Sequence, residues 1–148
     1  MSARDTILQS LAQSPARGAA LRREAMTALS GLPDYEWSGI YRLEGDTLVL
    51  DEYVGDATDH THIPVGRGVC GTAVAENANQ VIEDVRQLEN YLSCSTKTRS
   101  EIVVLIRRGG EEILGQIDID GHVVGTFGPD DEEFLERVAA ILAERWGA

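Results

Sequence analysis

The sequence is poor in cysteine, in basic residues and in long apolar segments, and each shortage excludes a class of protein. Its 148 residues include only two cysteines, too few for the disulfide framework of a small secreted domain. Lysine and arginine total 13 against 25 acidic residues, for a formal net charge of −12. Such a chain is repelled by the phosphates of nucleic acids and by anionic membranes, so we expect neither as a partner.

No apolar run is long enough to span a bilayer, and polar residues interrupt the N-terminal stretch MSARDTILQSLAQSPARG, unlike a secretory signal. We therefore expect a soluble, cytoplasmic protein whose thiols stay reduced unless they take part in redox chemistry. No repeat or Pro/Ser-rich linker divides the sequence, so residues 1–148 are expected to form one domain.

Hydrophobic periodicity predicts an α+β fold. Residues 1–32 form an N-terminal helical segment broken near SPARG, and residues 129–146 form a C-terminal helix. Between them we expect one hairpin over residues 37–54, a polar loop over 55–66, a short helix over 68–77, a short strand at QVIED and a second hairpin over 101–120. This order is typical of an antiparallel sheet covered on one face by the terminal helices, with the loops that hold the cysteines crossing the other.

The second hairpin separates apolar from acidic side chains. Alternation places Ile113, Gly115, Ile117 and Ile119 on one face, and Leu114, Gln116, Asp118 and Asp120 on the other. A turn centred between Gly109 and Gly110 would put Glu101 opposite Asp118. Like charges facing each other are destabilising, so these three carboxylates require a cation, a metal, protonation or open water. From the pattern alone, a solvated face with ordinary acidic residues is the preferred interpretation.

The two cysteines lie in different settings. Cys94 lies in the polar stretch YLSCSTKTRS beside Lys97 and Arg99, which favours a reactive thiolate. Cys70 lies at the start of the predicted short helix, in VGRGVCGTAVAEN. A helix N-terminus also favours a thiolate, but a small buried hydrophobic residue fits this place equally well.

Other candidate residues give weaker signals. Trp37 and Tyr41 share one face of the first hairpin and either line a pocket or fill the core, the commoner role of such residues. His60 and His62 are spaced to ligate a metal with Asp59, but a solvated loop is the preferred interpretation because no further ligand follows at metal-site spacing.

Four segments together resemble the free methionine-(R)-sulfoxide reductases, a branch of the GAF-domain superfamily. They are GRGVCGTA, CSTKTRSEIVVLI, GQIDID and FGPDDEEFLERVAAIL, and the resemblance runs from about Trp37 to the C-terminus. It implies a GAF-like fold, an antiparallel central sheet with the N- and C-terminal helices on one face and a ligand pocket on the other. It also implies thiol-dependent reduction of free L-methionine-(R)-sulfoxide to methionine.

The resemblance assigns roles residue by residue. Cys94 matches the catalytic cysteine and Cys70 a resolving cysteine, and Glu101, Asp118 and Asp120 match acidic residues that hold the substrate and assist proton transfer. Given a ligand pocket, we expect Trp37 and Tyr41 to contribute to substrate binding as well. It implies a sulfenic acid on Cys94, a Cys70–Cys94 disulfide and recycling by thioredoxin. It requires no metal or organic cofactor, and it is compatible with a homodimer formed through the helices.

The sequence also departs from the family pattern. His60 stands where the family commonly has a further cysteine, Ser95 follows Cys94 in place of an aspartate, and Leu105 replaces a proline. These departures leave an alternative, a non-catalytic GAF domain that binds a small molecule or senses redox state.

Overall fold

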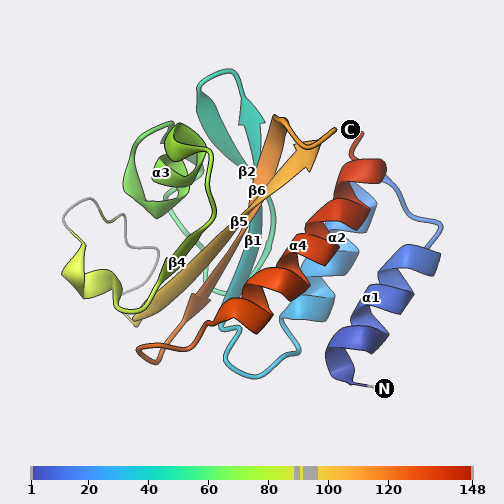
Figure 1. The fold of residues 1–148 in the computed structure, drawn as a ribbon, viewed down its shortest axis with the longest axis horizontal. Coiled ribbons are helices and arrows are strands. Elements are labelled where there is room, and N and C mark those ends of the chain that lie inside the picture. Colours follow the sequence, from blue (N-terminus) through green and yellow to red (C-terminus); the bar gives the residue numbers. More distant parts are fainter. Residues whose placement is uncertain (1, 89–90, 92–96, 148) are drawn as a thin grey trace.

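A six-stranded antiparallel sheet separates two unequal layers of helix (Figure 1). The computed structural model describes residues 2–88, 91 and 97–147. The helices are α1 (Ala3–Gln13), α2 (Gly18–Leu29), α3 (Gly68–Glu76) and α4 (Pro129–Glu144), with a short 3₁₀ turn at Val85–Gln87. The strands are β1 (Trp37–Glu44), β2 (Thr47–Val54), β3 (His62–Pro64), β4 (Gln80–Ile82), β5 (Ser100–Arg108) and β6 (Glu112–Gly121).

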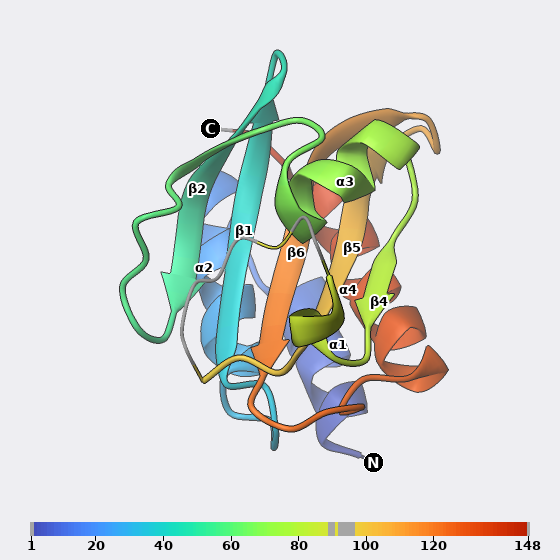
Figure 2. The ribbon, with the colours of Figure 1, turned by 90° about the vertical axis from the view of Figure 1, so that its left-hand side faces the viewer.

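The strands follow the order β3-β2-β1-β6-β5-β4, so β1 and β6 lie at the centre. Helices α1, α2 and α4 lie on one side of the sheet, and α3 lies on the other (Figure 2). This arrangement confirms the predicted α+β fold, with terminal helices on one face and the segment carrying Cys70 on the other. Within the described part of the chain, no helix is both long and apolar enough to cross a membrane.

The helical face of the sheet holds the larger apolar core. Leu21, Ala25 and Leu29 of α2 and Leu135, Val138 and Leu142 of α4 pack with Ile102, Val104, Ile117 and Ile119 of the sheet. All are at most 1% exposed, and burial of each large side chain contributes roughly 1.5–3 kcal/mol. This packing fixes β5 and β6 from behind, so the side chains on their other face are held in place.

Helix α4 begins at Pro129, the residue from which the sequence predicts it. Proline suits the first helical position, and Asp131 accepts a hydrogen bond from the Gly128 amide at 2.9 Å. The same carboxylate accepts hydrogen bonds from the Tyr35 hydroxyl at 2.7 Å and from the Arg4 guanidinium at 2.6 Å. Asp131 therefore also joins α4 to α1 and to the segment before β1.

The predicted pairing of the second hairpin is wrong by two residues. Glu101 pairs with Asp120, and Val103 pairs with Asp118. The three-residue connection after Arg108 shifts the pairing by one residue from the prediction. At the irregularity between Ile106 and Arg107, β6 has one extra residue, which shifts the pairing by one more. Because the total shift is even, Glu101, Asp118 and Asp120 still share a face.

The same irregularity reverses the faces at the start of β6. Leu114 packs in the core beneath the helices, and Ile113 packs on the α3 side, opposite to the prediction. Ile117 and Ile119 lie on the helical side as predicted.

The predicted polar loop over residues 55–66 contains a short edge strand, β3, which pairs with Thr47, Leu48 and Val49 of β2. Its three residues end in Pro64, and β3 lies at the edge of the sheet, where a strand tolerates proline. The chain then enters α3, so β3 helps to place Cys70.

Candidate active site

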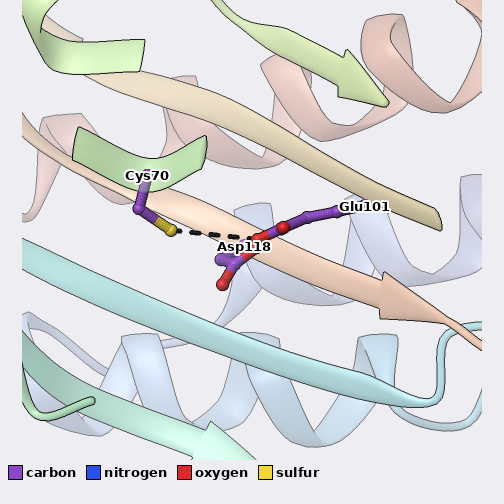
Figure 3. A group of neighbouring side chains, drawn as sticks. All are labelled: Cys70, Glu101 and Asp118. Carbon is purple, nitrogen blue, oxygen red and sulfur yellow. Dashed lines mark hydrogen bonds between the residues drawn. The ribbon is translucent and has the colours of Figure 1, made fainter. Parts of the chain in front are cut away.

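Cys70 lies in the first turn of α3, held close to the sheet by its neighbours. The backbone of Gly68 has a φ of +65°, which favours glycine, and Gly71 packs so tightly that an added Cβ would lie 2.6 Å from the Pro64 carbonyl. The Gln116 side-chain amide donates to the Cys70 carbonyl at 3.0 Å. As a result the Cys70 side chain, only 5% exposed, points at β5 and β6 (Figure 3).

The acidic face of the second hairpin is buried, so its interpretation as solvated is wrong. Glu101, Asp118 and Asp120 are 4%, 1% and 2% exposed, because α3 and the chain around it cover this side of the sheet. Cys70 Sγ lies 3.9 Å from Glu101 Oε2, and one ligand atom each of Cys70, Glu101 and Asp118 lie within 4.8 Å of one another (Figure 3). A thiol and two carboxyl groups therefore meet in one place.

Protons are the simplest way for these groups to coexist. Both side-chain oxygens of Asp118 lack a conventional donor among the described residues. Its close neighbours are the Glu101 carboxyl and the Cys70 thiol, which can donate to it only while they carry a proton. Burial raises the pKa of Asp118, and hydrogen bonds with Glu101 and Cys70 act in the opposite direction.

The pKa of Asp120 is raised further than the pKa of Asp118. Burial raises its pKa well above the usual value, and the negative charge of Asp118 acts in the same direction. The cluster therefore retains protons at a pH at which exposed aspartates have lost them, and it can act as a proton donor.

The cluster lines a pocket between α3 and the sheet. The pocket wall consists of Tyr41, His60, Ile63, Arg67, Gly68, Val69, Cys70, Glu101 and Asp118. The Tyr41 hydroxyl donates to the His60 carbonyl at 2.8 Å, which ties the central strand β1 to the segment before β3. The structure thus brings four of the predicted site residues, Cys70, Glu101, Asp118 and Tyr41, to one pocket.

Trp37 and Asp120 line a neighbouring hollow with Glu36, Gly55, Asp56, Lys97, Thr98 and His122. The Trp37 indole donates to the Asp56 carbonyl at 2.9 Å and stacks on Tyr53, with ring centroids 5.6 Å apart. Trp37 is therefore a fixed apolar wall of this hollow as well as a core residue.

Cys94, the predicted nucleophile, lies outside the described residues. The sequence analysis did not recognise Ile63, Arg67 and Val69 as pocket residues, because their place depends on the turn between β3 and α3. Gln116 was also missed as a support for Cys70, although its alternation with Asp118 and Asp120 placed it on the correct face.

The comparisons with known proteins agree with this geometry. The GAF domain family matches residues 19–146. The free methionine-R-sulfoxide reductase of Escherichia coli K12 is 46% identical over 112 residues, which cover 75% of this chain and 66% of that protein, just under two thirds.

Solved structures extend the likeness over nearly the whole chain. The fRMsr of Staphylococcus aureus in its reduced form has a TM-score of 0.88 and 32% identity, covering 96% of this chain and 94% of that one. The free methionine-R-sulfoxide reductase of Neisseria meningitidis, solved in complex with its substrate, has a TM-score of 0.88 and 31% identity, covering 97% and 86%.

The chain belongs to the free methionine-R-sulfoxide reductase family of GAF domains. The resemblance stated from the four sequence segments is therefore confirmed, and so is the GAF fold. In this reductase-family member, the buried Cys70, Glu101 and Asp118 lie on α3, β5 and β6, on the sheet face opposite the terminal helices.

Proposed function

We propose that the protein reduces free L-methionine-(R)-sulfoxide to methionine by thiol chemistry in the pocket between α3, β5 and β6. The observation that carries the proposal is the meeting of the Cys70 thiol with the buried carboxyl groups of Glu101 and Asp118. Thiol-dependent sulfoxide reduction needs thiols as the reductant and protons for the departing oxygen, and this pocket holds the Cys70 thiol beside carboxyl groups that can carry protons. Family membership supports the same substrate class.

The acidic cluster also suits a free amino acid. An α-ammonium group would supply the cation that Asp118 and its neighbours require, and a residue inside a peptide chain has no such group. In this proposal Asp118, Asp120 and Glu101 hold the ammonium, and Trp37 and Tyr41 enclose the apolar part of the substrate. Selection of the free amino acid follows, because the peptide-bound form would leave buried carboxylates unpaired.

The reaction balances with two thiols. The Cys94 thiolate attacks the sulfoxide sulfur, and an acid of the Glu101–Asp118 pair protonates the oxygen. The S–O bond of the substrate breaks as the protonated oxygen passes to the Cys94 sulfur, methionine leaves as the thioether, and Cys94 becomes a sulfenic acid. The Cys70 thiolate then attacks that sulfur, the hydroxyl leaves as water after accepting a proton, and a Cys70–Cys94 disulfide remains.

Turnover requires an external dithiol to reduce this disulfide. We propose thioredoxin for that role, and a reducing compartment such as the cytoplasm for the protein. We also propose that residues 1–148 act as one domain and that the helical face can form a homodimer.

The direct test is methionine release from free L-methionine-(R)-sulfoxide with dithiothreitol or a thioredoxin system as reductant. We expect release from the R epimer, and little from the S epimer or from a peptide. Asp118→Asn removes a proton donor and a substrate anchor, so kcat/KM should fall by roughly 10²–10⁴-fold. Asp59→Asn makes the same charge change at an exposed loop position and should leave kcat/KM unchanged.

Absence of release by the freshly reduced wild-type protein with either reductant would overturn the proposal. Ligand binding without release would then favour the alternative, a non-catalytic small-molecule-binding or redox-sensing GAF domain. Equal activity of Asp118→Asn and the wild type would show that the acidic cluster takes no part in the reaction.

A further inference from the structure

Cys70, Glu101 and Asp118 are arranged like the ligands of a metal ion, in addition to holding protons. Their sulfur and carboxylate oxygens lie within 4.8 Å of one another, and all three residues are buried. Two ligands on one tetrahedral zinc ion lie about 3.5 Å apart, given bond lengths of about 2.3 Å to sulfur and 2.0 Å to oxygen. The observed distance between Cys70 Sγ and Glu101 Oε2 is 3.9 Å, so a small movement of these side chains would let both atoms bind one ion.

Asp118 gives an independent reason to expect a cation. Its side chain is 1% exposed and directed into the cluster, yet neither oxygen has a conventional donor among the described residues (Figure 3). No conventional donor among the described residues fills the acceptor capacity of this carboxylate, and a metal ion can do so.

Rigid elements hold the three ligands. Cys70 is fixed by the packing of Gly71 and by the hydrogen bond from Gln116 to its carbonyl, while Glu101 and Asp118 lie on the adjacent strands β5 and β6. A preformed set binds metal with little loss of side-chain freedom.

We propose that the reduced pocket is a binding site for a thiophilic divalent cation such as Zn²⁺, with Cys70 Sγ and the carboxylates of Glu101 and Asp118 as ligands. One sulfur and two oxygens suit zinc, whereas Mg²⁺ and Ca²⁺ favour six or more oxygen ligands. The cation would not serve the reductase reaction. It would occupy the place proposed for the substrate ammonium and engage a thiol that the reaction needs, so it inhibits.

Binding is linked to the redox state of Cys70. Metal coordination requires the thiolate, and a cysteine in a disulfide has none to offer. The reduced protein therefore binds the cation and the oxidised protein releases it. This inhibitory consequence rests on the proposed function, but metal binding itself does not.

Co²⁺ reports the ligands directly, because a cobalt–thiolate bond gives a charge-transfer absorption in the near ultraviolet. Tag-free, reduced, full-length protein is titrated with Co²⁺ alone, and Zn²⁺ is then added to displace it. We expect the charge-transfer band in the wild type and in Cys94→Ser, and its loss in Cys70→Ser and after oxidation. Excess Mg²⁺ should not displace the cobalt.

The carboxylate ligands are tested in the same titration. Asp118→Asn should weaken Co²⁺ binding by more than the roughly 10–100-fold that loss of a mere supporting group costs. Asp46→Asn, exposed in the turn between β1 and β2 and outside the pocket, is the matched control and should bind as the wild type does. Circular dichroism of each variant checks that it is folded.

The proposal is overturned if the wild type gives no charge-transfer band, if the band persists in Cys70→Ser, or if it depends on Cys94 instead. Displacement of the cobalt by Mg²⁺ would also overturn it, since that result indicates an ordinary carboxylate site. If the proposed function fails, methionine release is absent with and without Zn²⁺ while the cobalt spectrum is unchanged, so the two failures are distinguishable.

Discussion

At the residue scale, the site depends on carboxyl groups kept in a place that does not favour their charge. Asp120 is 2% exposed, pairs with Glu101 across the strands and lies two residues from Asp118. Lys97 and His122 line the same hollow as Asp120. Burial of these carboxyl groups therefore lowers the stability of the fold, as expected of residues retained for binding or catalysis.

Replacing Asp120 by asparagine should therefore stabilise the protein at neutral pH. Burial and the Asp118 charge raise the pKa of Asp120 in the folded state, so its protonated form is favoured by folding. For such a group, stability is fully present below the unfolded pKa of about 3.9 and is lost as the pH rises through the folded pKa. Asparagine avoids this loss, and we expect a gain of about 1–3 kcal/mol at pH 7.

Urea unfolding of the wild type and Asp120→Asn between pH 4 and pH 8 measures this difference. The gain should shrink toward pH 4, while methionine release at pH 7 falls. Asp46→Asn, at an exposed position outside this hollow, is the control and should show no such pH-dependent gain. A variant less stable than the wild type at pH 7 would show that Asp120 is held ionised by a favourable partner.

At the scale of elements, periodicity predicted the helices, the central strands and the face on which the acids lie. It could not predict the pairing of Glu101 with Asp120, because this depends on loop length and on one irregular position near Ile106. It also could not predict burial of the acids. That burial results from α3 and its flanking segments folding over the sheet, and a strand's own alternation carries no information about what covers it.

The contact between α3 and β3 decides where Cys70 lies. In Gly71→Ala, the new Cβ would lie 2.6 Å from the Pro64 carbonyl and 3.0 Å from the Gly66 amide nitrogen, both backbone atoms. The helix must shift, so we expect a loss of about 1–3 kcal/mol in the free energy of unfolding and slower methionine release.

Gly31→Ala is the matched control for this substitution. Its Cβ would make only an ordinary contact of 3.4 Å with the Ala28 carbonyl. Thermal unfolding and kcat/KM should therefore change in Gly71→Ala alone. An unchanged kcat/KM in a destabilised Gly71→Ala protein would mean that the position of Cys70 tolerates movement of α3.

At the scale of the whole molecule, one arginine joins the helical layer to the sheet and to the end of the chain. Arg22 on α2 is 2% exposed, pairs with Asp51 of β2, donates to the carbonyls of Trp146 and Gly147, and lies over the Trp146 ring at 4.6 Å. Arg22→Met leaves the Trp146 and Gly147 carbonyls without this donor and Asp51 paired with Arg42 alone, and we expect a loss of about 3 kcal/mol.

Arg23, the next residue of α2, provides the comparison. Its side chain is 79% exposed and pairs with Glu52 at 3.0 Å, so Arg23→Met should cost less than about 1 kcal/mol. Urea unfolding separates the two variants. Equal and small losses would mean that water replaces Arg22 at its acceptors.

The proposed reaction consumes two thiols per methionine formed, which a single-turnover experiment tests most directly. Reduced protein is mixed with excess free L-methionine-(R)-sulfoxide in the absence of any reductant, and methionine and remaining thiols are counted. We predict one methionine per chain, loss of both thiols and a Cys70–Cys94 disulfide in the peptide map. Retention of both thiols with no methionine formed would contradict the account.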